Sequence, residues 1–162
     1  TKSQFVSAFN KAGQEFQRLF QRLFGGGQTE LVLTDPTDLL ETGVEIKVRL
    51  PGKEMANLQL LSGGERSLTA IAFLFSLLAV RPSPFCLLDE VDAALDEVNS
   101  RKFASLFQEM GDKTQFLVIT HNPVTMESAD YLYGVTVGDS GASKLLSVRL
   151  AEARSEQPSR PT

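Results

Sequence analysis

The sequence predicts an α/β fold, in which a largely parallel sheet is flanked by helices and accompanied by an antiparallel strand pair. Two observations predict the parallel sheet. Short apolar runs at residues 85–88 and 115–120 are typical of buried strands. Longer segments with helical periodicity, one starting at Ser62 and one at about 96–110, alternate with these runs. Alternation of strands with helices favours parallel pairing, because each helix returns the chain to the start of the next strand.

Composition limits the class of protein. The 162 residues, 42% of them hydrophobic, suffice for one core of ordinary domain size. A net charge of −4 argues against a chain that is basic throughout, although local basic patches that bind nucleic acid stay possible. The single Cys86 excludes a disulfide within this chain and indicates a small buried residue more than a reactive thiol. No signal peptide is recognisable, and the apolar stretch at 68–80 is too short to span a bilayer, so we expect a soluble protein.

The first 24 residues have the pattern of an amphipathic helix, which three glycines at 25–27 end. Its apolar residues are Phe5, Phe9, Ala12, Phe16, Leu19, Phe20 and Leu23. This stripe is more typical of a core face than of a binding face. The pattern begins at the first residue without a clear cap, which suggests a longer helix cut at this point.

The remaining elements are strands and a tail. Residues 29–34 and 43–50 alternate apolar and polar side chains, and a turn containing Asp-Pro separates them, so we expect an antiparallel pair. Residues 131–137 and 144–150 look like a closing hairpin. The tail at 151–162 is rich in Ser, Pro and charge and is predicted to be disordered.

A Ser-Gly-Gly turn at residues 62–64 directly precedes the second helical pattern. The start of a helix offers free backbone N–H groups and the positive end of a dipole, which together suit a phosphate. Ser62 can equally be a plain N-cap.

Two carboxylates and the only histidine follow the two apolar runs. Asp89 and Glu90 come at the carboxyl end of one predicted strand, and His121 comes after the other. Parallel strands bind ligands at this edge. For a nucleotide, Asp89 suits a magnesium ion reached through water, and Glu90 suits the attacking water. Each feature alone has an ordinary alternative, a solvated strand end or a structural histidine, so only the combination favours function.

In their order and spacing these motifs resemble those of the ATP-binding-cassette (ABC) ATPases. Leu-Ser-Gly-Gly-Glu at 61–65 resembles the signature motif, Phe-Cys-Leu-Leu-Asp-Glu at 85–90 fits Walker B, and His121 falls at the switch histidine. Asp-Ala-Ala-Leu-Asp at 92–96 is similar to the D-loop of the structural maintenance of chromosomes (SMC) family. One departure is Asn122-Pro123-Val124, where such proteins commonly carry two basic residues and a glycine, and this puts a DNA or nucleotide contact there in doubt.

The end of the chain extends the resemblance. Residues 125–137 and 141–148 look like the ending of bacterial SMC proteins, and the resemblance covers nearly all of residues 1–150. It implies that residues 1–24 are the end of a returning coiled-coil helix and that residues 25–150 are the C-terminal lobe of an ABC-type ATPase head.

The resemblance also implies roles for individual residues. Glu90 and His121 would be catalytic, and Asp89 would hold Mg through water. The residues that contact ATP would be Leu61, Ser62, Gly63, Gly64, Glu65 and Asp96. In such heads ATP lies between two heads, so that the signature of one head holds the γ-phosphate bound to the other.

The P-loop pattern G-x-x-x-x-G-K-[ST] is absent from this sequence. The chain therefore lacks the usual cradle for the β-phosphate and should bind ATP poorly alone. The resemblance implies that an N-terminal P-loop lobe of the same protein completes the head. Its other implied partners are a second SMC head in a homodimer, a kleisin subunit and DNA, with no membrane, in a bacterial cytoplasm near the nucleoid.

The implied function is ATP hydrolysis that drives head engagement in chromosome condensation and segregation. Two alternatives stay open. One is a head lobe of a related coiled-coil ATPase of DNA repair, against which the SMC-like ending weighs. The other is a lobe that serves mainly as a docking module for the kleisin.

Overall fold

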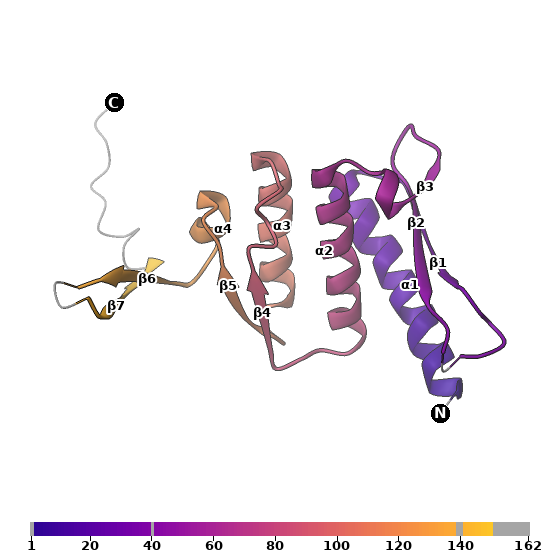
Figure 1. The fold of residues 1–162 in the computed structure, drawn as a ribbon, viewed down its shortest axis with the longest axis horizontal. Helices are drawn as coiled ribbons and strands as arrows, with labels where there is room; N and C mark the ends of the chain where they lie inside the picture. The colour runs from indigo at the N-terminus through magenta and orange to yellow at the C-terminus, as the bar shows by residue number, and fades with distance from the viewer. Residues whose placement is uncertain (1, 40, 139–140, 151–162) are drawn as a thin grey trace.

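In the computed structural model, residues 2–39, 41–138 and 141–150 are described, and they form a row of helices and short sheets (Figure 1). The predicted tail at 151–162 lies outside the described residues. The elements in chain order are α1 Lys2–Phe24, β1 Gln28–Leu33, β2 Val44–Arg49, β3 Met55–Asn57, η1 Leu58–Leu60, α2 Gly63–Val80, β4 Phe85–Asp89, α3 Glu97–Met110, β5 Gln115–Ile119, α4 Pro123–Glu127, β6 Tyr131–Val137 and β7 Ser143–Arg149. This is the mixed α/β class that the sequence predicts.

Helix α1 is amphipathic as predicted and packs along α2 (Figure 1). Its buried side chains are Ala12, Phe16, Leu19, Phe20 and Leu23. Its first turns are exposed, including Phe5 and Val6. Three residues after the helix ends, Gly27 at φ +93° brings the start of β1 against β2, and a Cβ there would lie 2.4 Å from the carbonyl oxygen of Arg49. Only glycine fits this approach.

The expected antiparallel pair is β1 and β2, in a register that places Thr29 opposite Val48 and Leu31 opposite Ile46. Strand β3 adds to the other edge of β2, which gives the order β1-β2-β3. Strand β3 and the short 3₁₀ helix η1 were not predicted from the sequence, and each has only three residues. They carry the chain from β2 to the start of α2.

Strands β4 and β5 pair in parallel, with Leu87 opposite Leu117, as the alternation of strands and helices predicts. Parallel pairing among the described residues is confined to these two strands. Their inward face packs on α2 and α3, where the rings of Phe75 and Phe116 stack at 5.5 Å and those of Phe107 and Phe116 lie 5.1 Å apart. Burial raises the pKa of the Cys86 thiol on this face, in agreement with a small packed residue.

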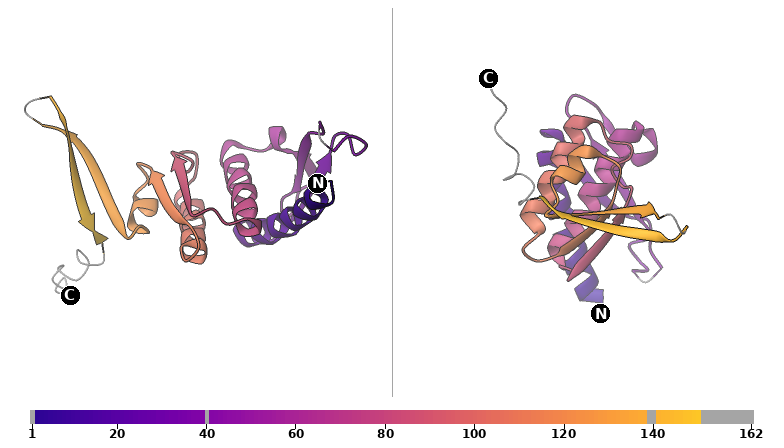
Figure 2. Two further views of the ribbon diagram at one scale, coloured as in Figure 1. Left: turned by 90° about the horizontal axis from the view of Figure 1, so that it is seen from below. Right: turned by 90° about the vertical axis from the view of Figure 1, so that its left-hand side faces the viewer.

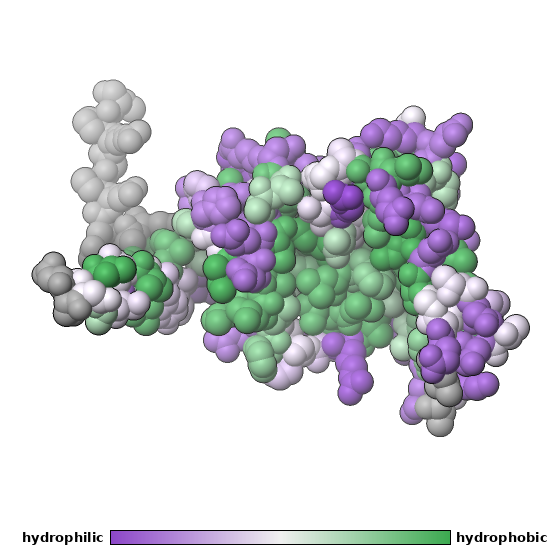
Figure 3. Space-filling model, in the orientation of Figure 1, coloured by the Kyte–Doolittle hydropathy of each residue, from purple (hydrophilic) through white to green (hydrophobic). Residues whose placement is uncertain are grey.

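The prediction that β4 and β5 are buried strands is wrong for their outward face. Phe85, Leu87, Leu117 and Ile119 are 67%, 57%, 58% and 51% exposed. The reason is that the helices of this chain cover one face of the sheet only. Figure 3 shows the resulting hydrophobic surface, which spreads over β4, β5 and the neighbouring part of α2.

The closing hairpin is also as predicted. Strands β6 and β7 pair antiparallel, with Tyr131 opposite Arg149, and the hairpin extends away from the helices (Figure 2). Among the described residues, α2 alone is long and apolar enough for a membrane span, a test that core helices of soluble proteins also pass. Its Leu68, Ala72 and Phe75 belong to the hydrophobic core.

Candidate functional site

The predicted catalytic residues meet at one edge of the parallel sheet. Asp89 ends β4 opposite Ile119, and the Glu90 N–H donates to the Ile119 carbonyl at 2.9 Å. His121 follows β5 by two residues, and its Nδ1 lies 3.6 Å from Glu90 Oε1. This distance is too long for a direct hydrogen bond but places the two side chains next to each other. Their side chains are 71% (His121) and 58% (Glu90) exposed, so a ligand can reach them.

The backbone of Glu90 has φ +47°, and Glu90 is the only non-glycine residue with positive φ in the described ranges 2–39, 41–138 and 141–150. The left-handed region is costly for a side chain with a Cβ, and such positions gather at functional sites. The turn directs the chain from β4 into the loop that contains residues 92–96, the segment that resembles a D-loop.

Buried Asp92 anchors that loop to the end of β5. Asp92 is 1% exposed, and its carboxylate accepts hydrogen bonds from the hydroxyls of Thr120 and Thr125. Thr120 Oγ1 also accepts the Asn122 N–H at 2.9 Å. The network fixes the backbone on both sides of His121.

The unusual Asn-Pro sequence after His121 has a structural role. Asn122 is the N-cap of α4, where its side chain accepts the Val124 N–H at 3.0 Å, and Pro123 occupies the first turn. The Asn122 amide also donates to Ser100 Oγ of α3 at 2.7 Å. Neither helix α4 nor the hydrogen bonds of Asp92 with Thr120 and Thr125 were predicted from the sequence, although the Asn-Pro pair is a recognisable helix start.

Replacement of Asp92 by alanine is expected to lower the free energy of unfolding by about 2–3 kcal/mol, because two threonine hydroxyls at a buried site lose their acceptor. Urea unfolding of the head that contains this chain measures the loss. The matched control is Asp112→Ala, an exposed acid in the turn after α3, with a change below about 0.5 kcal/mol. Equal effects of the two substitutions would contradict the anchoring role of Asp92.

The Ser-Gly-Gly turn is the N-terminus of α2, and its N-cap is Ser62. Ser62 Oγ accepts the Glu65 N–H, and Glu65 Oε2 in turn accepts the Ser62 N–H at 3.0 Å and the Ser62 hydroxyl at 2.9 Å. The plain N-cap interpretation of Ser62 is therefore confirmed, as part of a capping box. Ser62 and Gly63 are nevertheless exposed, and a Cβ on Gly63 would meet open space.

The Ser-Gly-Gly turn at residues 62–64 lies close to the loop at residues 92–96. A Cβ on Gly64 would lie 3.2 Å from the carbonyl oxygen of Ala94, so a larger residue would push these two segments apart. Of the other predicted ATP contacts, Leu61 packs against the hydrophobic core and Asp96 is the N-cap of α3, where it accepts the Asn99 N–H at 2.8 Å. The N-terminus of α2 and the carboxyl ends of β4 and β5 face the same side of the molecule (Figure 1).

For a metal ion, Asp89 is the candidate ligand. Among the described residues no group of three His, Cys, Asp or Glu side chains could hold a metal. A single exposed carboxylate fits magnesium that is held mainly by phosphate oxygens and water.

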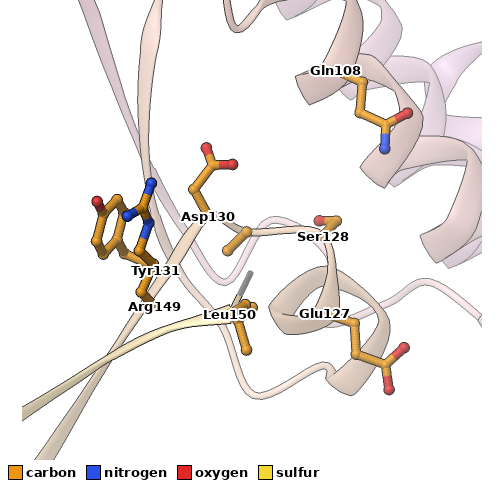
Figure 4. A pocket seen from close by; sticks show the side chains of 8 residues that line it. Gln108, Glu127, Ser128, Asp130, Tyr131, Arg149 and Leu150 are labelled. Carbon is orange, nitrogen blue, oxygen red and sulfur yellow. The ribbon is translucent and has the colours of Figure 1, made fainter. Parts of the chain in front are cut away.

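A separate hollow of about 430 Å³ lies at the base of the hairpin (Figure 4). Its lining includes Glu127, Asp130, Tyr131 and Arg149, with the Arg149 guanidinium 5.7 Å from the centre of the Tyr131 ring. None of the predicted site residues lines it.

This arrangement, a parallel sheet edge with two acids and a histidine beside a glycine-rich helix start, is that of an α/β protein whose candidate site lies at the carboxyl ends of its parallel strands. The chain belongs to the family described as RecF/RecN/SMC N terminal domain, whose model matches residues 10–144.

Individual relatives are chromosome partition proteins. The chain is similar to the chromosome partition protein Smc of Bacillus subtilis (strain 168), with 57% identity over 150 residues, 93% of this chain and 13% of that protein. The Smc of Coxiella burnetii (strain RSA 493 / Nine Mile phase I) is 50% identical over 153 residues, 94% of this chain and again 13% of its own length. The chain therefore spans only a small part of these relatives.

Solved SMC head structures share the fold. An SMC head bound to the C-winged helix domain of ScpA matches with a TM-score of 0.86 and 39% identity, over 94% of this chain and 47% of that one. A structure described under ATP-driven dimerization and DNA-stimulated activation of SMC ATPases matches with a TM-score of 0.82 and 37% identity, over 96% of this chain and 94% of that one.

Proposed function

We propose that this chain is the C-terminal lobe of an SMC-type ATPase head, which binds and hydrolyses ATP together with a P-loop lobe and a second head. Residues 1–24 are then the end of a coiled-coil helix, and residues 25–150 are the lobe itself. The observation that carries the proposal is the meeting of Asp89, Glu90 and His121 at the carboxyl edge of the parallel strands.

Each of these residues has a role in hydrolysis. Glu90 orients the attacking water and accepts its proton, and the strained backbone at this residue aims the carboxylate at the strand edge. His121 contacts the γ-phosphate from the neighbouring strand. Asp89 holds a magnesium ion through water, and the ion, when bound, neutralises charge on the phosphates.

The exposed hydrophobic face of the sheet supports the need for a second lobe. Phe85, Leu87, Leu117 and Ile119 form one contiguous side of β4 and β5, and parallel sheets are normally covered on both faces. Because the sequence also has no P-loop, a P-loop lobe that packed on this face would both cover the sheet and supply the phosphate cradle.

The signature residues act on the nucleotide of the partner head. Leu61, Ser62, Gly63, Gly64 and Glu65 form the start of α2, where open space beside Gly63 allows close approach of a phosphate. Asp96 follows in the loop that touches Gly64. ATP then joins the two heads, and loss of the γ-phosphate releases them.

The wider role follows from the relatives. They are bacterial chromosome partition proteins, and one similar head structure is bound to the C-winged helix domain of ScpA. We infer that the full protein acts in chromosome condensation and segregation in the cytoplasm, with DNA, a kleisin subunit and a second copy of itself as partners and no membrane.

ATP turnover is expected to be absent from this chain alone and from a separately produced P-loop lobe alone. When the lobes are mixed, turnover should rise more steeply than linearly with protein concentration, because two heads must meet around ATP. A steady-state phosphate-release assay with Mg-ATP measures it. A verified stable complex of the two lobes that shows no ATP turnover, even with DNA present, would contradict the proposal.

If the complex of the two lobes showed no ATP turnover, a second candidate function would be favoured, namely a docking module for the kleisin. The exposed hairpin β6–β7, with Tyr133, Val135 and Leu145 on its surface, is the observation that favours it. A head lobe of a related DNA-repair ATPase is the remaining alternative, and the chromosome partition relatives weigh against it.

A further inference from the structure

Lys53 reaches the first turn of α2 from outside the motif. It lies in the turn between β2 and β3, where its backbone N–H donates to the Leu50 carbonyl at 3.0 Å. Its Nζ donates to Glu65 Oε1 at 2.7 Å. The Lys53 side chain is 60% exposed and that of Glu65 is 27% exposed. The ion pair therefore joins the β2–β3 turn to the signature residues.

The other oxygen of Glu65 faces Ser62. Glu65 Oε2 accepts the Ser62 hydroxyl at 2.9 Å and the Ser62 N–H at 3.0 Å. The single hydroxyl hydrogen of Ser62 is donated to Glu65 here, so a phosphate oxygen bound by Ser62 would take this hydrogen from Glu65. Such an oxygen would lie within about 6 Å of the carboxylate, since one hydrogen bond and one contact of similar length separate them. The hydrogen bond from Lys53, and after it those from Ser62, lower the pKa of Glu65, so its carboxylate is charged at neutral pH.

An anion at this position opposes the proposed ligand. Like charges repel, and at about 6 Å in a partly exposed site the repulsion is large enough to weaken phosphate binding severalfold. Glu65 is nevertheless part of the capping box that orders the first turn of α2. The Glu65 side chain is therefore needed for the geometry of the helix start, but its negative charge must be compensated before a phosphate can bind.

We propose that Lys53 is a positioning residue of the signature site, which neutralises Glu65 and holds it in the capping box so that a triphosphate can approach Ser62. The inference rests on the proposed function and adds to it a residue that lies eight positions before the signature motif. Lys53 acts through Glu65 and not by direct contact with the nucleotide, and this distinction is testable.

The test is steady-state ATP turnover of the full-length protein that contains this chain. Lys53→Met is expected to lower kcat/KM for ATP about three- to tenfold, because Glu65 is then an uncompensated charge. The loss should shrink as salt rises from about 0.1 M to about 1 M, where the Debye length falls from about 10 Å to about 3 Å. Lys53→Arg, which keeps the charge, and Lys113→Met, an exposed lysine in the turn after α3, should leave kcat/KM unchanged.

The decisive variant combines Lys53→Met with Glu65→Gln. Glutamine keeps the capping box without the charge, so the double variant should recover the kcat/KM of Glu65→Gln alone. If Lys53→Met costs as much in the Glu65→Gln background as in the unsubstituted protein, the lysine contacts the nucleotide directly and the inference is overturned. A Lys53→Met protein with unchanged kcat/KM overturns it as well, while the proposed function stands. Absence of turnover in the unsubstituted protein overturns both.

Discussion

Glu90→Gln is expected to slow ATP hydrolysis by the assembled head at least about a hundredfold, because glutamine cannot accept the proton of the attacking water. Glutamine has the same shape as glutamate, and Glu90 is 58% exposed, so the fold and ATP binding should stay intact. Two heads joined by unhydrolysed ATP should then remain engaged for longer. Single-turnover hydrolysis and sedimentation velocity with Mg-ATP measure these two effects.

The matched control is Glu30→Gln, an exposed glutamate on β1 far along the chain from the parallel strands, which should leave turnover unchanged. Normal turnover in the Glu90→Gln head would remove Glu90 from the role of base. Loss of ATP binding together with turnover would instead indicate a contact of Glu90 with the nucleotide or its metal ion.

The element types could be predicted because each has a local signal. The helical stripe that ends at Gly25 predicts α1, and the Ser62-x-x-Glu65 spacing is a capping box that marks the start of α2. Parallel pairing of β4 and β5 follows from the intervening helix α3. Glu90 and His121 could be placed together because parallel strands end at one edge.

The burial of β4 and β5 could not be predicted from their sequence. An apolar run such as 85–88 has the same composition whether its outward face is covered by this chain or by another lobe. Which element packs on the outer face of the strand depends on other segments of the protein, and the sequence of the strand does not specify them. This is why Phe85 and Leu87 are exposed here although the pattern is that of a buried strand.

The interactions that support the site also escaped prediction, for a different reason. Asp92 is bonded to Thr120 and Thr125, which lie 28 and 33 positions later, and Lys53 is bonded to Glu65 across 12 positions. Polar contacts at such separations depend on how β2, β4 and β5 are arranged. Periodicity reports which face of an element is apolar, but it does not pair particular polar side chains across elements.

Ser62→Arg is expected to abolish ATP-dependent association of two heads while ATP binding to each head stays largely intact. Ser62 is exposed at the start of α2, with open space beside Gly63, and an arginine would fill the space that the partner's phosphate needs. Loss of the N-cap should cost only about 1 kcal/mol, too little to unfold the head.

The informative result is that ATP binding to each head and association of the two heads respond differently. The residues that would bind a head's own nucleotide are Asp89, Glu90 and His121, and they lie at the sheet edge and not at the start of α2. Equilibrium binding of a labelled ATP measures the first effect, and sedimentation velocity of heads that also carry Glu90→Gln measures the second. Ser147→Arg, an exposed serine on β7, adds the same charge elsewhere and should leave association unchanged. Unaltered ATP-dependent association of the Ser62→Arg heads would contradict a role of this turn at the partner's nucleotide, and the capping box would then be the whole function of Ser62.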